Sequence, residues 1–69
     1  MTVLDIVNEQ FGGDYKLFCE HINISRQRYE HIKKRGLATN KTLTKILEAQ
    51  LIDDSDVIQV GNFAYIPYK

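Results

Sequence analysis

Two short amphipathic segments separated by a tight turn set the strongest constraint on how this chain folds. Asp14 is a favourable helix N-cap, and apolar residues recur after it at helical spacing until Asn23. Asn tolerates the left-handed conformation that ends a helix, and Ser25 is a residue type that begins one. Gly36 then ends the second segment. The pattern predicts two helices joined by a tight turn within residues 14 to 36.

Helical patterns also flank this pair on both sides. Before it, Thr2 is a cap residue for a helix that ends at Gly12-Gly13. After it, the apolar spacing from about Lys41 to Leu51 predicts a further helix, and the acidic run at 53 to 56 forms the turn that follows. The chain is therefore expected to begin with four short helices.

The C-terminal segment, at about 57 to 68, predicts a β-hairpin. Two runs of β-branched or aromatic residues flank Gly61-Asn62, a dipeptide typical of a two-residue hairpin turn. In that register Val60 faces Phe63 and Ile58 faces Tyr65, and we expect the face that carries these four side chains to cover the helices. The opposite face is expected to provide the apolar contact of a homodimer through Val57, Ile66 and Tyr68.

The expected fold is mainly α (α+β), one domain over residues 1 to 69 with four short helices and then the hairpin. A domain this small buries only about 60% of its unfolded surface, so self-association would stabilise it further. The lone Cys19 cannot form an internal disulfide, and no residue cluster has zinc-like spacing, so no cofactor is expected. No apolar stretch approaches the roughly 20 residues that cross a bilayer, and no signal peptide is evident. We expect the protein to be located in the cytoplasm of a bacterial host cell and to make no contact with a membrane.

A net charge of zero hides a strong segregation of charge along the chain. Residues 25 to 45 hold seven basic side chains and one acidic side chain, a balance of +6, whereas the segments before and after each sum to −3. A chain with this distribution offers one surface to a polyanion such as nucleic acid. A solvated helix face without a binding partner is the alternative explanation.

The middle of the chain resembles the helix-turn-helix of lambda-type phage repressors and Cro proteins. In that family a small residue lies in the first helix, apolar residues flank the turn and recur in the second helix, and the turn holds Gly or a substitute. Here these places are held by Cys19, Ile22, Asn23, Ile24, Tyr29 and Ile32. The resemblance covers residues 15 to 34. The chain departs from the family pattern at three positions, because Cys19 stands in place of the usual Ala, Asn23 in place of Gly, and Tyr29 in place of Val or Ile. It implies that the helix from Ser25 to Gly36 enters DNA.

On a helical wheel the polar side of this helix separates from its apolar side. Arg, Gln and Glu side chains match the hydrogen-bonding edges of guanine, adenine and cytosine. The resemblance implies that four residues read the bases, namely Arg26, Gln27, Glu30 and His31. For Glu30 the alternative is an intrahelical ion pair with Arg26 or Lys34, and for His31 it is a solvated side chain.

The other cations of the segment are better suited to phosphate, and the start of the fourth helix could offer backbone N–H groups to one. The predicted phosphate-binding residues are Arg28, Lys33, Lys34, Arg35, Thr39, Asn40, Lys41 and Lys45.

These features predict a sequence-specific transcriptional regulator of phage or mobile-element type, a Cro-like repressor that binds a double-stranded DNA operator as a homodimer. We expect no enzymatic activity, because Cys19 and His21 lie two apart on a helix and point to different sides. One alternative is an excisionase, in which the hairpin serves as a wing against DNA. Another is a phage-encoded protein inhibitor or antitoxin-like module that uses the same scaffold to bind a protein partner.

Overall fold

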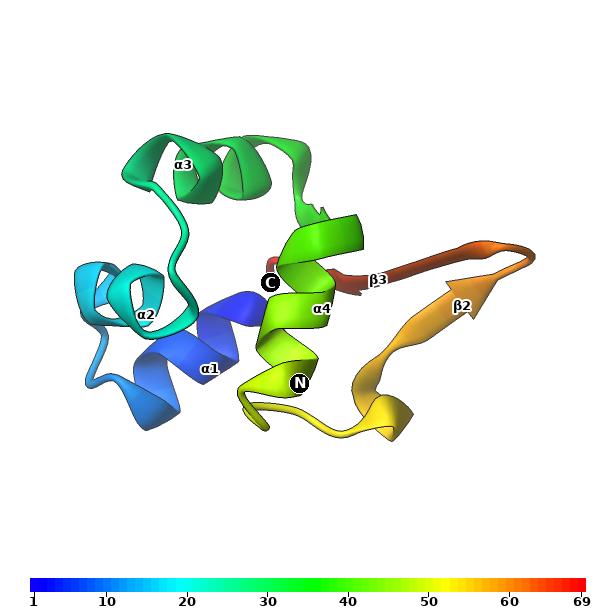
Figure 1. Ribbon diagram of the computed structural model, residues 1–69, viewed down its shortest axis with the longest axis horizontal. Coiled ribbons are helices and arrows are strands. Elements are labelled where there is room, and N and C mark those ends of the chain that lie inside the picture. The colour runs from blue at the N-terminus through cyan, green and yellow to red at the C-terminus, as the bar shows by residue number, and fades with distance from the viewer.

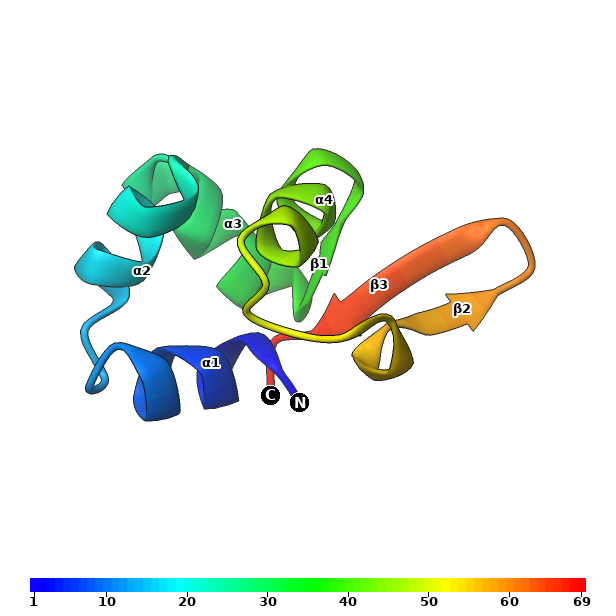
Figure 2. The same ribbon diagram turned by 60° about the horizontal axis from the view of Figure 1, so that its bottom comes forward.

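The computed structural model describes all residues from Met1 to Lys69. The expected α+β architecture of four helices followed by a C-terminal hairpin is confirmed (Figure 1), and the structure adds a short strand before the fourth helix (Figure 2). No helix has both the length and the apolar character that a bilayer span requires. In chain order the elements are α1 (Val3–Gln10), α2 (Tyr15–Ile22), α3 (Arg26–Arg35), β1 (Leu37–Thr39), α4 (Asn40–Glu48), the 3-10 helix η1 (Asp54–Asp56), β2 (Ile58–Val60) and β3 (Phe63–Pro67).

The first three helices begin directly after the cap residues that the sequence predicts. Thr2 and Asp5 form a capping box at α1, in which each side chain accepts a hydrogen bond from the other residue's backbone N–H. Asp14 caps α2 and Ser25 caps α3 through their side-chain oxygens. Asn23 ends α2 in the left-handed conformation at φ 57°. Local hydrogen bonding therefore sets the short turn between α2 and α3.

The fourth helix is shorter than expected and begins one residue earlier. It covers Asn40–Glu48, whereas the sequence predicts a helix from about Lys41 to Leu51. Gln50 lies in the left-handed region at φ 59°, which ends the helical path before Leu51. Leu51 is nevertheless buried in the core, so its apolar character reflects packing and not helix continuation.

The sheet has three antiparallel strands in the order β1-β3-β2. The expected hairpin register is confirmed, because Val60 pairs with Phe63 and Ile58 pairs with Tyr65. The sequence analysis missed β1, which pairs with the other edge of β3 and places Ala38 opposite Ile66. Both β1 and β3 contact α4, so the third strand fixes the hairpin against the helices.

The predicted orientation of the hairpin faces is wrong. Ile66 and Tyr68 are buried and Val57 packs against the core, so these three residues do not form a free apolar face for a dimer. The four side chains expected to cover the helices instead face away from the core. The alternation of a strand defines two faces but not which one is buried. Here the pairing of β1 with β3 holds the Ile66 side of β3 against the core, so this side of the hairpin is the buried one. The tip of the hairpin extends beyond the helices (Figures 1 and 2).

Tyr29 of α3 links α2 to the C-terminal segment within the core. Its ring stacks on Tyr15 at 5.0 Å between centroids and meets the rings of Phe18 and Tyr68 edge-on at 6.0 Å. Its hydroxyl lies 3.2 Å from that of Tyr68 in a buried hydrogen bond. Burial, the hydrogen bond and the neighbouring Tyr68 raise the pKa of Tyr29, so the phenol stays protonated.

We expect Tyr68→Phe to lower the free energy of unfolding by about 1 to 3 kcal/mol, because the Tyr29 hydroxyl loses its partner inside the core. Urea unfolding followed by circular dichroism measures the change. Tyr65→Phe is the matched control, because Tyr65 is only half-buried and its hydroxyl makes no hydrogen bond within the protein. Equal losses in the two variants would contradict a role for the buried pair.

Candidate nucleic-acid interface

The polar face of α3 is open to solvent along its whole length. Tyr29 and Ile32 point into the core, and the other eight residues of the helix are exposed. Gln27 and His31 line two adjoining shallow hollows on this face, one of which also includes Glu30. The structure therefore brings together three of the four predicted base-reading residues on one surface.

Arg26, the fourth predicted reader, is turned toward α2. Its guanidinium carbon is 5.9 Å from the centre of the Tyr15 ring, in a cation–π arrangement at the start of α2. It lines neither hollow that holds Gln27 and His31. Arg26 therefore flanks the polar face on the α2 side.

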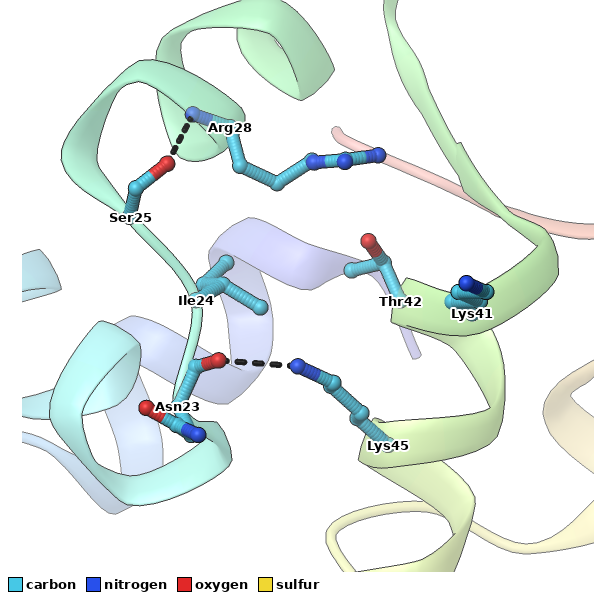
Figure 3. Close-up of a pocket in the computed structure, with 7 residues that line it drawn as sticks. All are labelled: Asn23, Ile24, Ser25, Arg28, Lys41, Thr42 and Lys45. Carbon is cyan, nitrogen blue, oxygen red and sulfur yellow. Dashed lines mark hydrogen bonds between the residues drawn. The ribbon is translucent and has the colours of Figure 1, made fainter.

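A cleft of about 210 Å³ opens on the other flank, between the α2–α3 turn and the start of α4 (Figure 3). The Nζ atom of Lys45 donates a 2.8 Å hydrogen bond to the Asn23 carbonyl across this cleft, which ties α4 to the turn. The lining side chains are mostly polar or basic, so the cleft suits an anion. They are Asn23, Ile24, Ser25, Arg28, Lys41, Thr42 and Lys45.

Thr42 is the least exposed residue of this cleft. Only 4% of its surface is accessible, and its hydroxyl makes no hydrogen bond within the protein. The hydroxyl points into the cleft, between the start of α4 and Arg28 (Figure 3). The hydroxyl oxygen itself is accessible from the cleft, because no fully buried side-chain polar atom of the protein lacks a hydrogen-bond partner. A hydroxyl that faces a cleft without an internal partner is an available donor for a ligand oxygen.

None of the seven cations in residues 25 to 45 is neutralised by a carboxylate. The structure contains one ion pair, in which the Met1 ammonium group lies 3.2 Å from Asp56. Glu30 accordingly makes no ion pair with Arg26 or Lys34, which was the alternative explanation for this residue. The positive charge of the segment remains available on the surface of α3 and α4.

The other predicted phosphate-binding residues fall into two groups. Lys33, Lys34 and Arg35 occupy the last turn of α3, where basic side chains also stabilise the helix dipole. Asn40 lines a shallow hollow on α4 with Lys41 and Lys45. Thr39, by contrast, is half-buried within β1, pairs with Tyr65 and forms no side-chain cap on α4.

Sequence reasoning missed Thr42 and the Asn23 carbonyl as parts of this surface. Thr42 directly follows Lys41 in a predicted helix, but sequence alone does not show that its hydroxyl lacks a partner. Asn23 was assigned only to the turn. Both residues acquire their place here because α4 packs across the turn.

Cys19 is buried behind this surface in the contact between α2 and the core. Burial raises the pKa of the Cys19 thiol, although Arg26 acts in the opposite direction. The thiol is therefore held in its protonated, weakly nucleophilic form.

Comparisons of the chain with protein-family models, with curated proteins and with solved structures give no match.

Proposed function

We propose that this protein is a sequence-specific double-stranded DNA-binding transcriptional regulator of phage or mobile-element type, with α2 and α3 as a helix-turn-helix. The observation that carries the proposal is the set of seven cations on α3 and α4, none of which forms an ion pair with a carboxylate. Such a surface attracts the phosphate backbone of a duplex and releases its counterions. The resemblance of residues 15 to 34 to lambda-type repressors and Cro proteins supports the same function.

In this proposal the exposed face of α3 lies in the major groove. Gln27 can bind both the N6 and N7 positions of adenine, and Glu30 can accept from the cytosine amino group. His31 lies on the same face, one helical turn from Gln27. Arg26 is positioned by Tyr15 at the edge of this surface and contacts a flanking base or phosphate.

The cleft between the α2–α3 turn and α4 would hold one backbone phosphate. Arg28 and Lys41 supply charge from its two walls, and Thr42 supplies a hydroxyl donor from its floor. A phosphate held there orients α3 in the groove without reading sequence, while the bases are read by the exposed face of α3. The protein would then act by occupying promoter DNA.

The two alternative functions differ in which surface they use. An excisionase wing needs cations at the hairpin tip, but residues 57 to 68 include no charged side chain, which disfavours this function. A protein inhibitor or antitoxin-like module would instead use the same scaffold to bind a protein partner. The exposed apolar hairpin is compatible with that function, and DNA binding distinguishes the two.

The first test concerns the phosphate role of the cleft cations. We expect Lys41→Gln to weaken binding to all duplex sequences alike and to reduce the slope of log affinity against log salt by about one. Lys69→Gln removes the same charge outside the basic segment and is expected to leave the slope unchanged. Fluorescence anisotropy at several salt concentrations measures both, and identical slopes in the two variants would contradict the phosphate role.

The second test concerns the hydroxyl in the cleft. We expect Thr42→Val to weaken DNA binding by about 0.5 to 1.5 kcal/mol on every sequence, because a hydrogen bond to phosphate is lost while the charge is unchanged. The salt slope should stay at its wild-type value. Thr44→Val is the control, because the Thr44 hydroxyl donates to the Asn40 carbonyl within α4. An equal effect of the two substitutions would exclude a specific role for Thr42.

The third test concerns base reading by α3. We expect Gln27→Ala to cost about 1 to 3 kcal/mol on the preferred site and to relax selection at one base position. Selection of bound sequences from a random duplex pool, followed by titration, measures both effects. Gln59→Ala changes a solvent-exposed Gln of the hairpin and should alter neither. A loss for Gln27→Ala that is equal on preferred and random DNA would refute its assignment.

A further inference from the structure

Lys45 differs from the other cations of the basic segment. Six of the seven basic side chains in residues 25 to 45 are exposed, whereas Lys45 is half-buried. Its ammonium group is also the only one of the seven cationic groups that hydrogen-bonds within the protein. The acceptor is the carbonyl of Asn23, 22 residues earlier in the chain, at 2.8 Å (Figure 3). This distance is typical of a charge-assisted hydrogen bond.

The acceptor lies at the C-terminal end of α2. Asn23 ends this helix, and its left-handed conformation at φ 57° turns the chain toward α3. The last carbonyl groups of an α-helix have no partner within the helix and form the negative end of its dipole. No backbone N–H group donates to the Asn23 carbonyl, so Lys45 is its donor within the protein. Lys45 therefore stabilises the end of α2 both by its charge and by its hydrogen bond.

This hydrogen bond connects the α2–α3 turn to a helix outside the pair. In the packing of the elements α2 contacts α3, whereas α4 contacts β1 and β3. The core holds α4 through its apolar side, where Leu43 and Ile46 are buried. Lys45 directly precedes Ile46, so its side chain reaches the turn from a backbone position that the core fixes. The turn that sets the direction of α3 is thereby tied to the core through α4.

We propose that Lys45 is a positioning residue, which fixes the α2–α3 turn and with it the direction of α3, and that it does not bind phosphate. Exposure divides the roles of the three cations in the cleft. Arg28 and Lys41 are exposed and their charged groups have no hydrogen-bond partner in the protein, whereas the Lys45 ammonium group already bonds to Asn23. The sequence alone predicts all three as phosphate ligands. The effect of the fixed turn on DNA reading rests on the proposed function.

Amide hydrogen exchange in the free protein, followed by NMR, tests the positioning role without DNA. Lys45→Met keeps the apolar stem of the side chain but removes the charge and the donor. The amides of Asn23 and Ile24 bond to carbonyls in the last turn of α2. They should exchange about 2- to 10-fold faster in this variant, because the turn opens more often. The amide of Phe11, which bonds to the Val7 carbonyl at the end of α1, should keep its wild-type rate.

Lys41→Met is the matched control, because it removes the same charge from the same cleft without breaking a hydrogen bond. It should leave exchange at the turn unchanged. Lys45→Arg restores a charged donor and should return the two turn amides toward their wild-type rates. The proposal is overturned if Lys45→Met leaves these amides unchanged, if Lys41→Met accelerates them equally, or if Lys45→Arg exchanges as fast as Lys45→Met. An equal acceleration at Phe11 also overturns it, because that indicates a general loss of stability.

On DNA the two lysine variants should differ in kind. Lys41→Met should weaken binding to preferred and random duplexes alike and lower the salt slope by about one. Lys45→Met should keep the salt slope but reduce the ratio of the two affinities about 3- to 10-fold, because α3 is held less precisely. An unchanged ratio, or an equal fall of the slope in both variants, overturns the positioning role. If the wild type binds no duplex, the proposed function fails, while the exchange rates still decide whether Lys45 holds the turn.

Discussion

Docking of the C-terminal strand is the interaction on which the rest of this structure depends. The backbone N–H of Tyr68 donates to the Gly36 carbonyl at the end of α3, and its own carbonyl accepts from Leu4 in α1, each at 2.8 Å. The Tyr68 hydroxyl meets that of Tyr29 in the core. One residue near the C-terminus thus links the first helix, the third helix and the sheet. In a chain of 69 residues with a small core, such links add a large share of the tertiary constraint.

Docking of the C-terminal strand also positions the candidate DNA surface. Tyr29 is fixed between Tyr15 and Tyr68, so the inner side of α3 is held and its polar side is left to solvent. The strand β1 then leads the chain from α3 directly into α4, whose Lys45 bonds to the turn that precedes α3. Arg28 of α3 and the two α4 cations Lys41 and Lys45 meet at one cleft because the core holds both helices against the turn.

The basic residues and the apolar hairpin lie on different elements of the protein. The basic residues gather on α3 and α4, and the hairpin from 57 to 68 has no charge at all. A charged surface attracts a polyanion, whereas an uncharged apolar surface gains free energy when it is removed from water. The basic surface and the apolar hairpin therefore favour contacts of different physical kinds and share no residues.

The sequence by itself determined the first three helices with their N-caps, the presence of a fourth helix, and the hairpin register, because these depend on interactions among residues close in the chain. Thr2, Asp14, Asn23 and Ser25 satisfy or end neighbouring backbone groups, and Gly61-Asn62 sets the register of β2 and β3. The exposure of the α3 polar face also followed from helical periodicity.

Tertiary structure alone decided which side of the hairpin is buried, that β1 completes the sheet, and that Thr42 lies unpaired in a cleft with Arg28. Strand alternation makes two faces equally available, and only the docking of β1 and β3 on α4 chooses between them. These three features depend on contacts between residues that are far apart in the chain, so no local sequence pattern predicts them.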